Sequence, residues 1–218
     1  SKGKNVYVEK PLALSHSQLD KIISVYKENE KINKNLNLMV GFNRRFSPHV
    51  QKVKETIGNN SMPINIIANM NAGSIPKSHW VHDLNIGGGR IIGEACHLMD
   101  VCIFLTGSMI SSVCMNGLGH SPDLDTDNVN IFLNFTNGSN AVINYFSNGS
   151  KGYSKERVEV YSQERTLVMD NWRKLNGYGF KGFSGAKSSQ DKGHFNQFQA
   201  LVNQQKNGGK AIIPFDEI

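Results

Sequence analysis

The sequence lacks long apolar runs. Its 218 residues contain only short, interrupted apolar stretches, well under the roughly 20 residues that a membrane-spanning helix requires. No basic segment followed by an apolar run opens the chain, so no secretion signal is expected. The chain also contains no internal repeat. These absences argue against a membrane partner and against a repeat protein.

Cysteine is scarce, and the spacing of the cysteines does not suggest disulfide pairs. An odd set of three favours reduced thiols in a cytoplasmic protein. The spacing of His79, His82, Cys96 and His97 matches no closed zinc pattern, so no metal is expected. The three cysteines are Cys96, Cys102 and Cys114.

The charge is positive but dispersed. The net charge is +6 and the pI is near 9.2. The lysines are scattered, and no basic run alternates with aromatic residues as a nucleic-acid groove requires. Attraction of a phosphorylated or carboxylated small molecule explains the same charge. We therefore expect a small-molecule partner and no nucleic acid.

The first 45 residues have the pattern of a βαβ unit. Residues 5–8 form a β-rich run, and Ser15 is a plausible N-cap for a helix with apolar residues at helical spacing. Residues 36–42 indicate a second strand. A strand, a helix and a strand in this order imply a parallel sheet. Two such strands are not a complete sheet, so residues 1–45 are expected to be the tail of a larger α/β domain.

Residues 46–218 indicate a second domain of the α+β class. A helix from Ser47, a strand over 64–71, a loop over 73–89 and a helix ending near Leu105 come first. Short turns then separate β-rich segments as in antiparallel hairpins. We expect these strands over residues 110–118, 128–135, 140–146, 157–162 and 165–169.

The end of this domain is less regular. The glycine-rich residues 177–192 are expected to be irregular. An amphipathic helix with apolar residues at 195, 198, 201 and 202 follows and ends at residues 207–209, and another helix begins near Pro214. The predicted fold class is α+β: a mostly antiparallel open sheet flanked by helices, preceded by the βαβ remnant.

One predicted helix carries a polar stripe on an otherwise apolar surface. It follows the glycines at 87–89 and presents Glu94, His97 and Asp100 at steps of three. An imidazole placed this way is a candidate proton-transfer group, because His titrates near neutral pH. Alternatively, His97 only caps the polar side of a packed helix. Glu94 would orient His97, bind a substrate hydroxyl or face solvent, and Asp100 is expected to make a structural hydrogen bond.

Four motifs in order resemble the Gfo/Idh/MocA family of NAD(P)-dependent sugar and cyclitol dehydrogenases. The resemblance covers nearly the whole chain. It implies that residues 1–45 are the C-terminal remnant of a Rossmann dinucleotide-binding domain and that residues 46–218 are a substrate-binding and dimerisation domain. The amino-acid sequences of residues 80–83 and 178–183 further resemble a subgroup of the family. In that subgroup this module is fused behind a zinc-type alcohol dehydrogenase module. The four motifs are Glu9-Lys10-Pro11, the Gly-Phe-Asn-Arg-Arg-Phe segment at 41–46, the glycine-rich segment and helix at 87–100, and the hairpin at 129–145.

The resemblance implies roles for particular residues. Lys10 and His97 would be catalytic: the Lys10 ammonium would polarise the reacting oxygen, and His97 would be the general base in alcohol oxidation. The alternative is that Lys10 is an ordinary surface lysine with no catalytic role. Either arginine of the pair at 44 and 45 would bind a phosphate or carboxylate or make an interdomain salt bridge. The implied cofactor-binding residues are Glu9, Lys10, Pro11 and Arg44, and the implied substrate-binding residues are Glu94, His79, Trp80 and Arg45.

The chain departs from the family pattern in two ways. The dinucleotide fingerprint is absent, because Gly117-Leu118-Gly119 lacks a third glycine and lies among hairpins. NAD or NADP is therefore expected in the full-length protein, while this fragment is expected to bind neither and to be inactive alone. Gly93 also stands where many members carry an aspartate, and Glu94 is the only adjacent substitute. This second departure keeps open a non-catalytic dimerisation and ligand-binding module of a larger enzyme.

The resemblance also implies a sugar-like substrate and a homo-oligomer. In this family the sheet commonly pairs with its copy in a second subunit. Apolar residues on both faces of the hairpin fit that expectation, although helices of the same chain would cover a face equally well. The residues concerned are Ile131, Leu133 and Phe135 together with Val142, Asn144 and Phe146.

Overall fold

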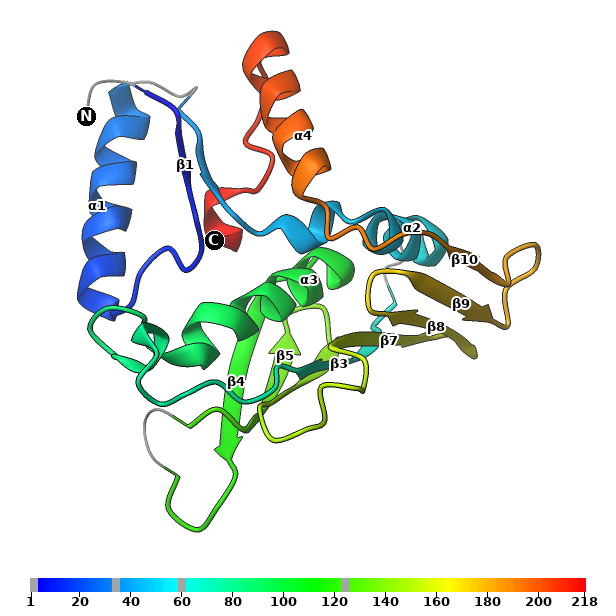
Figure 1. Cartoon of the computed structure of the whole chain (residues 1–218). Helices are drawn as coiled ribbons and strands as arrows, with labels where there is room; N and C mark the ends of the chain where they lie inside the picture. Colours follow the sequence, from blue (N-terminus) through cyan, green and yellow to red (C-terminus); the bar gives the residue numbers. More distant parts are fainter. Residues whose placement is uncertain (1–3, 33–35, 59–61, 123–125) are drawn as a thin grey trace.

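The computed structural model describes residues 4–32, 36–58, 62–122 and 126–218. Its strands form two sheets, one of two strands and one of eight (Figure 1). None of the helices formed by the described residues has the length and apolar character needed to cross a membrane.

The N-terminal part is the βαβ unit predicted from the sequence. Strand β1 (Val6–Val8) leads through helix α1 (His16–Ile32) to strand β2 (Leu38–Val40). The two strands are parallel, with Val6 opposite Leu38. Their carboxyl ends therefore lie at one edge, which is where open α/β sheets place their ligands.

The large sheet is mostly antiparallel, as expected, with one parallel pair. Its strand order is β10-β9-β8-β7-β3-β6-β5-β4, and the parallel pair is β3 with β6. The strands are β3 (Asn65–Asn71), β4 (Ile110–Gly117), β5 (Val129–Phe135), β6 (Asn140–Phe146), β7 (Glu156–Ser162), β8 (Arg165–Asp170), β9 (Lys174–Tyr178) and β10 (Gly185–Lys187).

The expectation of an irregular segment over 177–192 is wrong in part. Strand β9 extends into it, and β10 pairs with β9 so that Gly185 lies opposite Asn176. A Cβ on Gly185 would lie 2.4 Å from the Leu175 carbonyl oxygen. Glycine is thus required for this close pairing, but glycine also removes the apolar alternation that identifies a strand.

Two helices cover one face of the large sheet (Figure 1). They are α2 (Pro48–Ile57) and α3 (Cys96–Thr106), and α3 ends at Gly107 in the left-handed conformation. Ile131 and Leu133 point into this core, whereas Val142 and Phe146 point to the opposite, open face. The alternation on β5 and β6 therefore divides the predicted residues between a buried face and an open one.

A buried ion pair joins the two parts of the chain. Arg45 lies in a short 3₁₀ helix (Asn43–Phe46) that follows β2. Its Nε donates to both carboxylate oxygens of Asp100 on α3, at 3.0 and 3.1 Å. Its Nη1 donates to Glu217 at 2.8 Å, in a 3₁₀ turn (Phe215–Glu217) where the sequence predicted a helix.

The expectation that Arg45 binds substrate is therefore replaced. Its side chain is only 4% exposed, and its guanidinium is used by Asp100 and Glu217. The sequence left a salt bridge as the alternative role for this arginine, and the structure shows one, between the turn after β2 and helix α3. Asp100 thereby makes the structural hydrogen bond expected for it. Helix α4 (His194–Asn207) reinforces the junction, because Gln197 donates to the Val40 carbonyl oxygen at 3.1 Å.

Replacement of Arg45 by methionine should destabilise the fold strongly. The variant leaves the Asp100 carboxylate buried without its partner, which typically costs about 3–5 kcal/mol. Urea denaturation of Arg45→Met against the unmodified protein measures this loss. The matched control is Lys52→Met, which breaks the exposed Lys52–Glu55 pair and should change stability by about 0–1 kcal/mol. A loss below about 1 kcal/mol in Arg45→Met would show that the pair does not hold the junction.

Candidate active site

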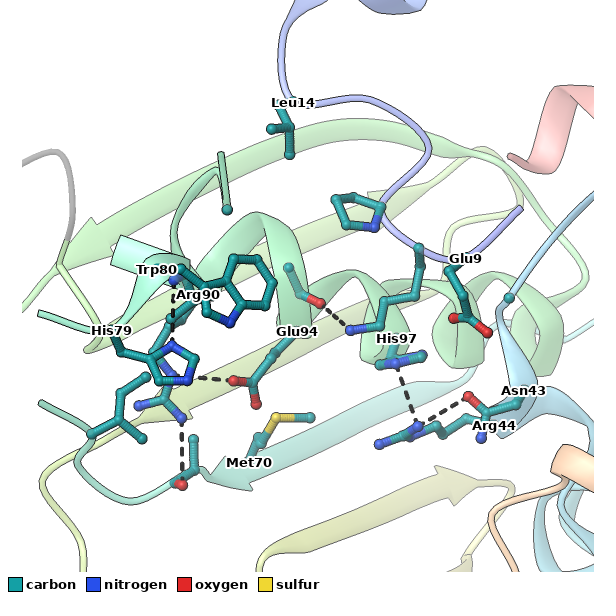
Figure 2. A pocket seen from close by; sticks show the side chains of 18 of the residues that line it. Glu9, Leu14, Asn43, Arg44, Met70, His79, Trp80, Arg90, Glu94 and His97 are labelled. Carbon is teal, nitrogen blue, oxygen red and sulfur yellow. Dashed lines mark hydrogen bonds and ion pairs between the residues drawn. The ribbon is translucent and has the colours of Figure 1, made fainter. Parts of the chain in front are cut away.

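A cavity of about 790 Å³ opens at the carboxyl edge of the small parallel sheet. Its walls come from the segment after β1, the segment after β2, the 72–90 loop, the start of α3 and the start of α4. Figure 2 shows Glu9, Asn43, Arg44 and His97 at one end, and His79, Trp80 and Arg90 at the other.

Lys10 enters this cavity directly after β1. Its Nζ donates to the Gly93 carbonyl oxygen at 2.6 Å. That carbonyl belongs to a π-helical turn (Ile91–Ala95) that precedes α3, and such turns are frequent at functional sites. An ammonium has three N–H donors. One bond to Gly93 therefore leaves Lys10 able to donate to a bound molecule.

His97 lies in the first turn of α3 and is only 4% exposed. Its Nε2 is 3.3 Å from Nη1 of Arg44, and its Nδ1 has no hydrogen-bond partner among the described residues. Burial lowers the pKa of His97 to about 2, with further contributions from Arg44, Lys10 and the start of α4. The imidazole is therefore neutral at physiological pH and holds a lone pair that can accept a hydrogen bond.

Arg44 is held by a buried carboxylate. Its Nε and Nη2 donate to the two oxygens of Glu156 at 3.3 and 3.2 Å, and its Nη1 donates to the Asn43 side chain at 3.0 Å. Lys192 also donates to Glu156, at 2.7 Å. Burial alone would raise the pKa of Glu156, but Arg44 and Lys192 outweigh it and lower that pKa. Most donors of Arg44 are therefore already in use.

The far end of the cavity is built around Arg90 and Glu94. Arg90 donates to the Glu94 carboxylate at 3.1 Å and to the Gly73 carbonyl oxygen at 2.7 Å. Glu94 keeps part of its carboxylate exposed to the cavity. Trp80 is 61% exposed beside it. Glu94 thus pairs with Arg90, and among the described residues no hydrogen bond joins it to His97.

The structure brings most of the predicted site residues to one cavity. Arg45 is the exception. Sequence analysis did not identify Arg90, Lys155, Gln197, His194 or the buried Glu156. The residues predicted from sequence that line the cavity are Glu9, Lys10, Pro11, Arg44, His79, Trp80, Glu94 and His97.

Glu156 carried a signal that could have identified it. It is the first residue of β7, whose positions 156, 158 and 160 point into the core. A glutamate in the inward register of a strand requires buried partners. The identity of those partners depends on the fold, because Arg44 and Lys192 are far from it in sequence.

Among the described residues, only one wall of the cavity has features that fit a dinucleotide. The wall formed by Glu9, Lys10 and Pro11 at the carboxyl edge of parallel strands fits the reactive end of such a cofactor. Gly117 ends β4 and Gly119 follows it, and among the described residues 118–122 no helix begins whose N-terminus could bind a pyrophosphate. In the described ranges, no group of three or more metal-binding side chains is placed to hold an ion.

Comparison with known proteins reveals relatives among dehydrogenases. The chain is 27% identical over 175 residues to the oxidoreductase YrbE of Bacillus subtilis, and 27% identical over 177 residues to myo-inositol 2-dehydrogenase of Thermotoga maritima. Each alignment covers 78% of this chain and 49% and 50% of the respective relative. The chain thus spans about half the length of the curated relatives that it matches.

Solved structures show the same fold. A Kribbella flavida oxidoreductase domain protein superposes with a TM-score of 0.78 at 18% identity, covering 96% of this chain and 68% of that one. A UDP-N-acetylglucosamine 3-dehydrogenase of Acidithiobacillus ferrooxidans superposes with a TM-score of 0.74 at 19% identity, covering 96% and 64%. The comparisons do not support the finer resemblance to a subgroup fused to a zinc-type alcohol dehydrogenase.

The family follows from the central part of the sequence. A family model described as the GFO/IDH/MocA C-terminal domain matches residues 52–168, which is more than half of the chain. This span contains α3, the cavity residues of the 72–90 loop and most of the large sheet. The chain therefore belongs to the Gfo/Idh/MocA family and contains its C-terminal domain.

Proposed function

We propose that this chain is the substrate-binding part of an NAD(P)-dependent dehydrogenase that acts on a sugar, a sugar nucleotide or a cyclitol. The observation that carries the proposal is the meeting of Lys10 and His97 in one cavity at the carboxyl edge of parallel strands. The names of two relatives, an inositol dehydrogenase and a UDP-N-acetylglucosamine dehydrogenase, support this substrate class.

The proposed chemistry uses one donor and one acceptor. In alcohol oxidation the hydride leaves carbon with its electron pair, the hydroxyl proton leaves oxygen, and a C=O bond forms. Lys10 donates a hydrogen bond to that oxygen and stabilises its negative charge as the proton leaves. His97, which is neutral, accepts the proton.

Other cavity residues would hold the substrate. The Glu94 carboxylate accepts hydrogen bonds from ring hydroxyls, while its hydrogen bond with Arg90 keeps it oriented. Trp80 presents an apolar ring face at the cavity wall, and His79 lies beside it with ring centroids 5.7 Å apart. Such a wall suits a molecule whose hydroxyls surround an apolar ring face.

The proposal assigns the cofactor to the full-length protein. NAD or NADP, when bound, supplies the hydride acceptor or donor. Glu9, Lys10, Pro11 and Arg44 form the wall of the cavity that would contact it. We propose the division between the two domains at residue 45, which separates the βαβ unit from the family domain. We propose the cytoplasm as the compartment, which the three free cysteines favour.

Lys10→Ala and His97→Ala should each reduce turnover at least about 100-fold, because each removes a group that acts on the reacting oxygen or its proton. The assay uses the full-length protein that contains this chain. It follows nicotinamide reduction with inositols, free sugars and sugar nucleotides. Circular dichroism and thermal denaturation verify that the variants fold.

The matched controls are Lys21→Ala on α1 and His120→Ala after β4, which are exposed and lie outside the cavity. Both should retain full turnover. Unchanged turnover in folded Lys10→Ala or His97→Ala would refute the assignment. Absence of turnover on every substrate of the panel would favour the non-catalytic ligand-binding module.

We also propose that two copies of the chain pair through the open face of the large sheet. That face carries Phe132 at 50% exposure, with Val142 and Ile67 beside it in register. Asparagines flank this apolar row, and they form hydrogen bonds across strands from Asn130 to Asn144 at 2.7 Å and from Asn144 to Asn69 at 2.6 Å. An apolar centre within a polar border is typical of a protein interface.

Phe132→Glu should convert the dimer to a monomer, because it places an unpaired carboxylate in the centre of a self-complementary interface. Light scattering coupled to size exclusion measures the mass. The control Phe195→Glu changes an exposed phenylalanine on α4 and should leave the dimer intact. A monomeric unmodified protein, or a dimeric Phe132→Glu variant, would contradict the proposal.

A further inference from the structure

The contact between Arg44 and His97 has a definite direction. A guanidinium carries only N–H donors and has no acceptor. The 3.3 Å contact of Arg44 Nη1 with His97 Nε2 therefore requires Nε2 to be the accepting nitrogen. In a neutral imidazole the proton must then lie on Nδ1.

Arg44 is itself fixed in this orientation. Its opposite edge meets both oxygens of Glu156, whose side chain is fully buried. Its Nη1 is also bound by Asn43. A planar guanidinium that is hydrogen-bonded to Glu156 on one edge and to Asn43 on another cannot rotate its Nη1 away from His97 without losing bonds to the buried carboxylate.

We propose that Arg44, held by Glu156, is the positioning residue that fixes which nitrogen of His97 is free of a proton. It holds Nε2, at the tip of the ring, as the acceptor in the resting site. A substrate hydroxyl then donates to the same lone pair in place of the long 3.3 Å contact, while Arg44 stays where it is on its bonds to Asn43 and Glu156. The catalytic meaning of this inference rests on the proposed function. The assignment of the tautomer is independent of that function.

The charges around His97 act in the same direction. Lys10 faces it from the segment after β1, Arg44 from the turn after β2, and Lys192 and His194 from the start of α4. On its own helix its neighbours are Cys96 and Asp100. Glu156 of β7 offsets Arg44 and Lys192 but does not contact the imidazole. Positive charge thus dominates, and removal of Arg44 should raise the pKa of His97.

The first measurement needs no substitution of Arg44. Long-range ¹H–¹⁵N spectra of full-length protein labelled with ¹⁵N-histidine distinguish a protonated from an unprotonated ring nitrogen. The His97 signals are identified by their loss in His97→Gln. We expect a protonated Nδ1, an unprotonated Nε2, and no titration between pH 8 and pH 5. Protonation of Nε2, or titration near the ordinary histidine pKa of about 6.5, would overturn the inference.

The second measurement uses Arg44→Met, which removes the donor and its charge. Loss of a like charge at this range should raise the proton affinity of His97 about 10- to 1000-fold. The tautomer should no longer be confined to Nδ1–H. Arg173→Met, an exposed arginine outside the cavity, is the control and should leave the His97 spectrum unchanged. An Arg44→Met spectrum identical to that of the unmodified protein would also overturn the inference.

Kinetics separate the two proposals. In the unmodified enzyme His97 should contribute no acidic limb to the kcat/KM profile down to about pH 5. Arg44→Met should lower kcat and bring an acidic limb toward neutral pH. If the spectra are as expected but His97→Ala retains turnover, the catalytic role fails while the tautomer assignment stands. If His97→Ala is inactive but the spectra show Nε2–H, the catalytic role stands and the positioning role of Arg44 fails.

Discussion

Two adjacent arginines in one 3₁₀ turn hold the molecule together. Arg45 reaches Asp100 on α3 and Glu217 at the chain end, while Arg44 reaches Glu156 on β7 and His97 on α3. Neighbouring residues in so short a turn point in different directions, so one turn fixes the small sheet to two sides of the larger domain. Each buried charge would be costly alone. The fold therefore places three carboxylates from distant segments around this one turn.

This arrangement determines where the cavity forms. The turn follows β2, and the contacts of Arg44 with His97 and of Arg45 with Asp100 hold the carboxyl edge of the parallel strands next to α3. Lys10, which follows β1, then reaches the carbonyl of Gly93. That carbonyl lies in the π-helical turn before α3, so a donor from the segment after β1 meets the start of the helix that carries His97. The position of the cavity therefore follows from the ion pairs that join the turn after β2 to the larger sheet and its helices.

The sequence predicted much of this arrangement from local pattern. The βαβ order, the helix bearing His97 and most of the hairpins follow from periodicity and glycine placement, and the family motifs indicated Lys10 and His97. Strand β10 was missed because Gly185 replaces apolar alternation with close backbone contact. The two arginines could not be assigned in advance. Their partners, Glu156 and Asp100, are 112 and 55 positions away, and only the folded chain shows which arginine faces the cavity.

The charge state of His97 bears on what the site recognises. A neutral imidazole offers a lone pair, and the Lys10 ammonium offers donors. An alcohol can donate a hydrogen bond to the imidazole and accept one from the ammonium at the same time, whereas a ketone can only accept. The positive groups around His97 hold the imidazole in its unprotonated form, so under the proposed function the resting site complements the alcohol more fully than the carbonyl product. A cation cluster that serves the fold by neutralising Glu156 would thus also set which side of the redox reaction the empty site is prepared to bind.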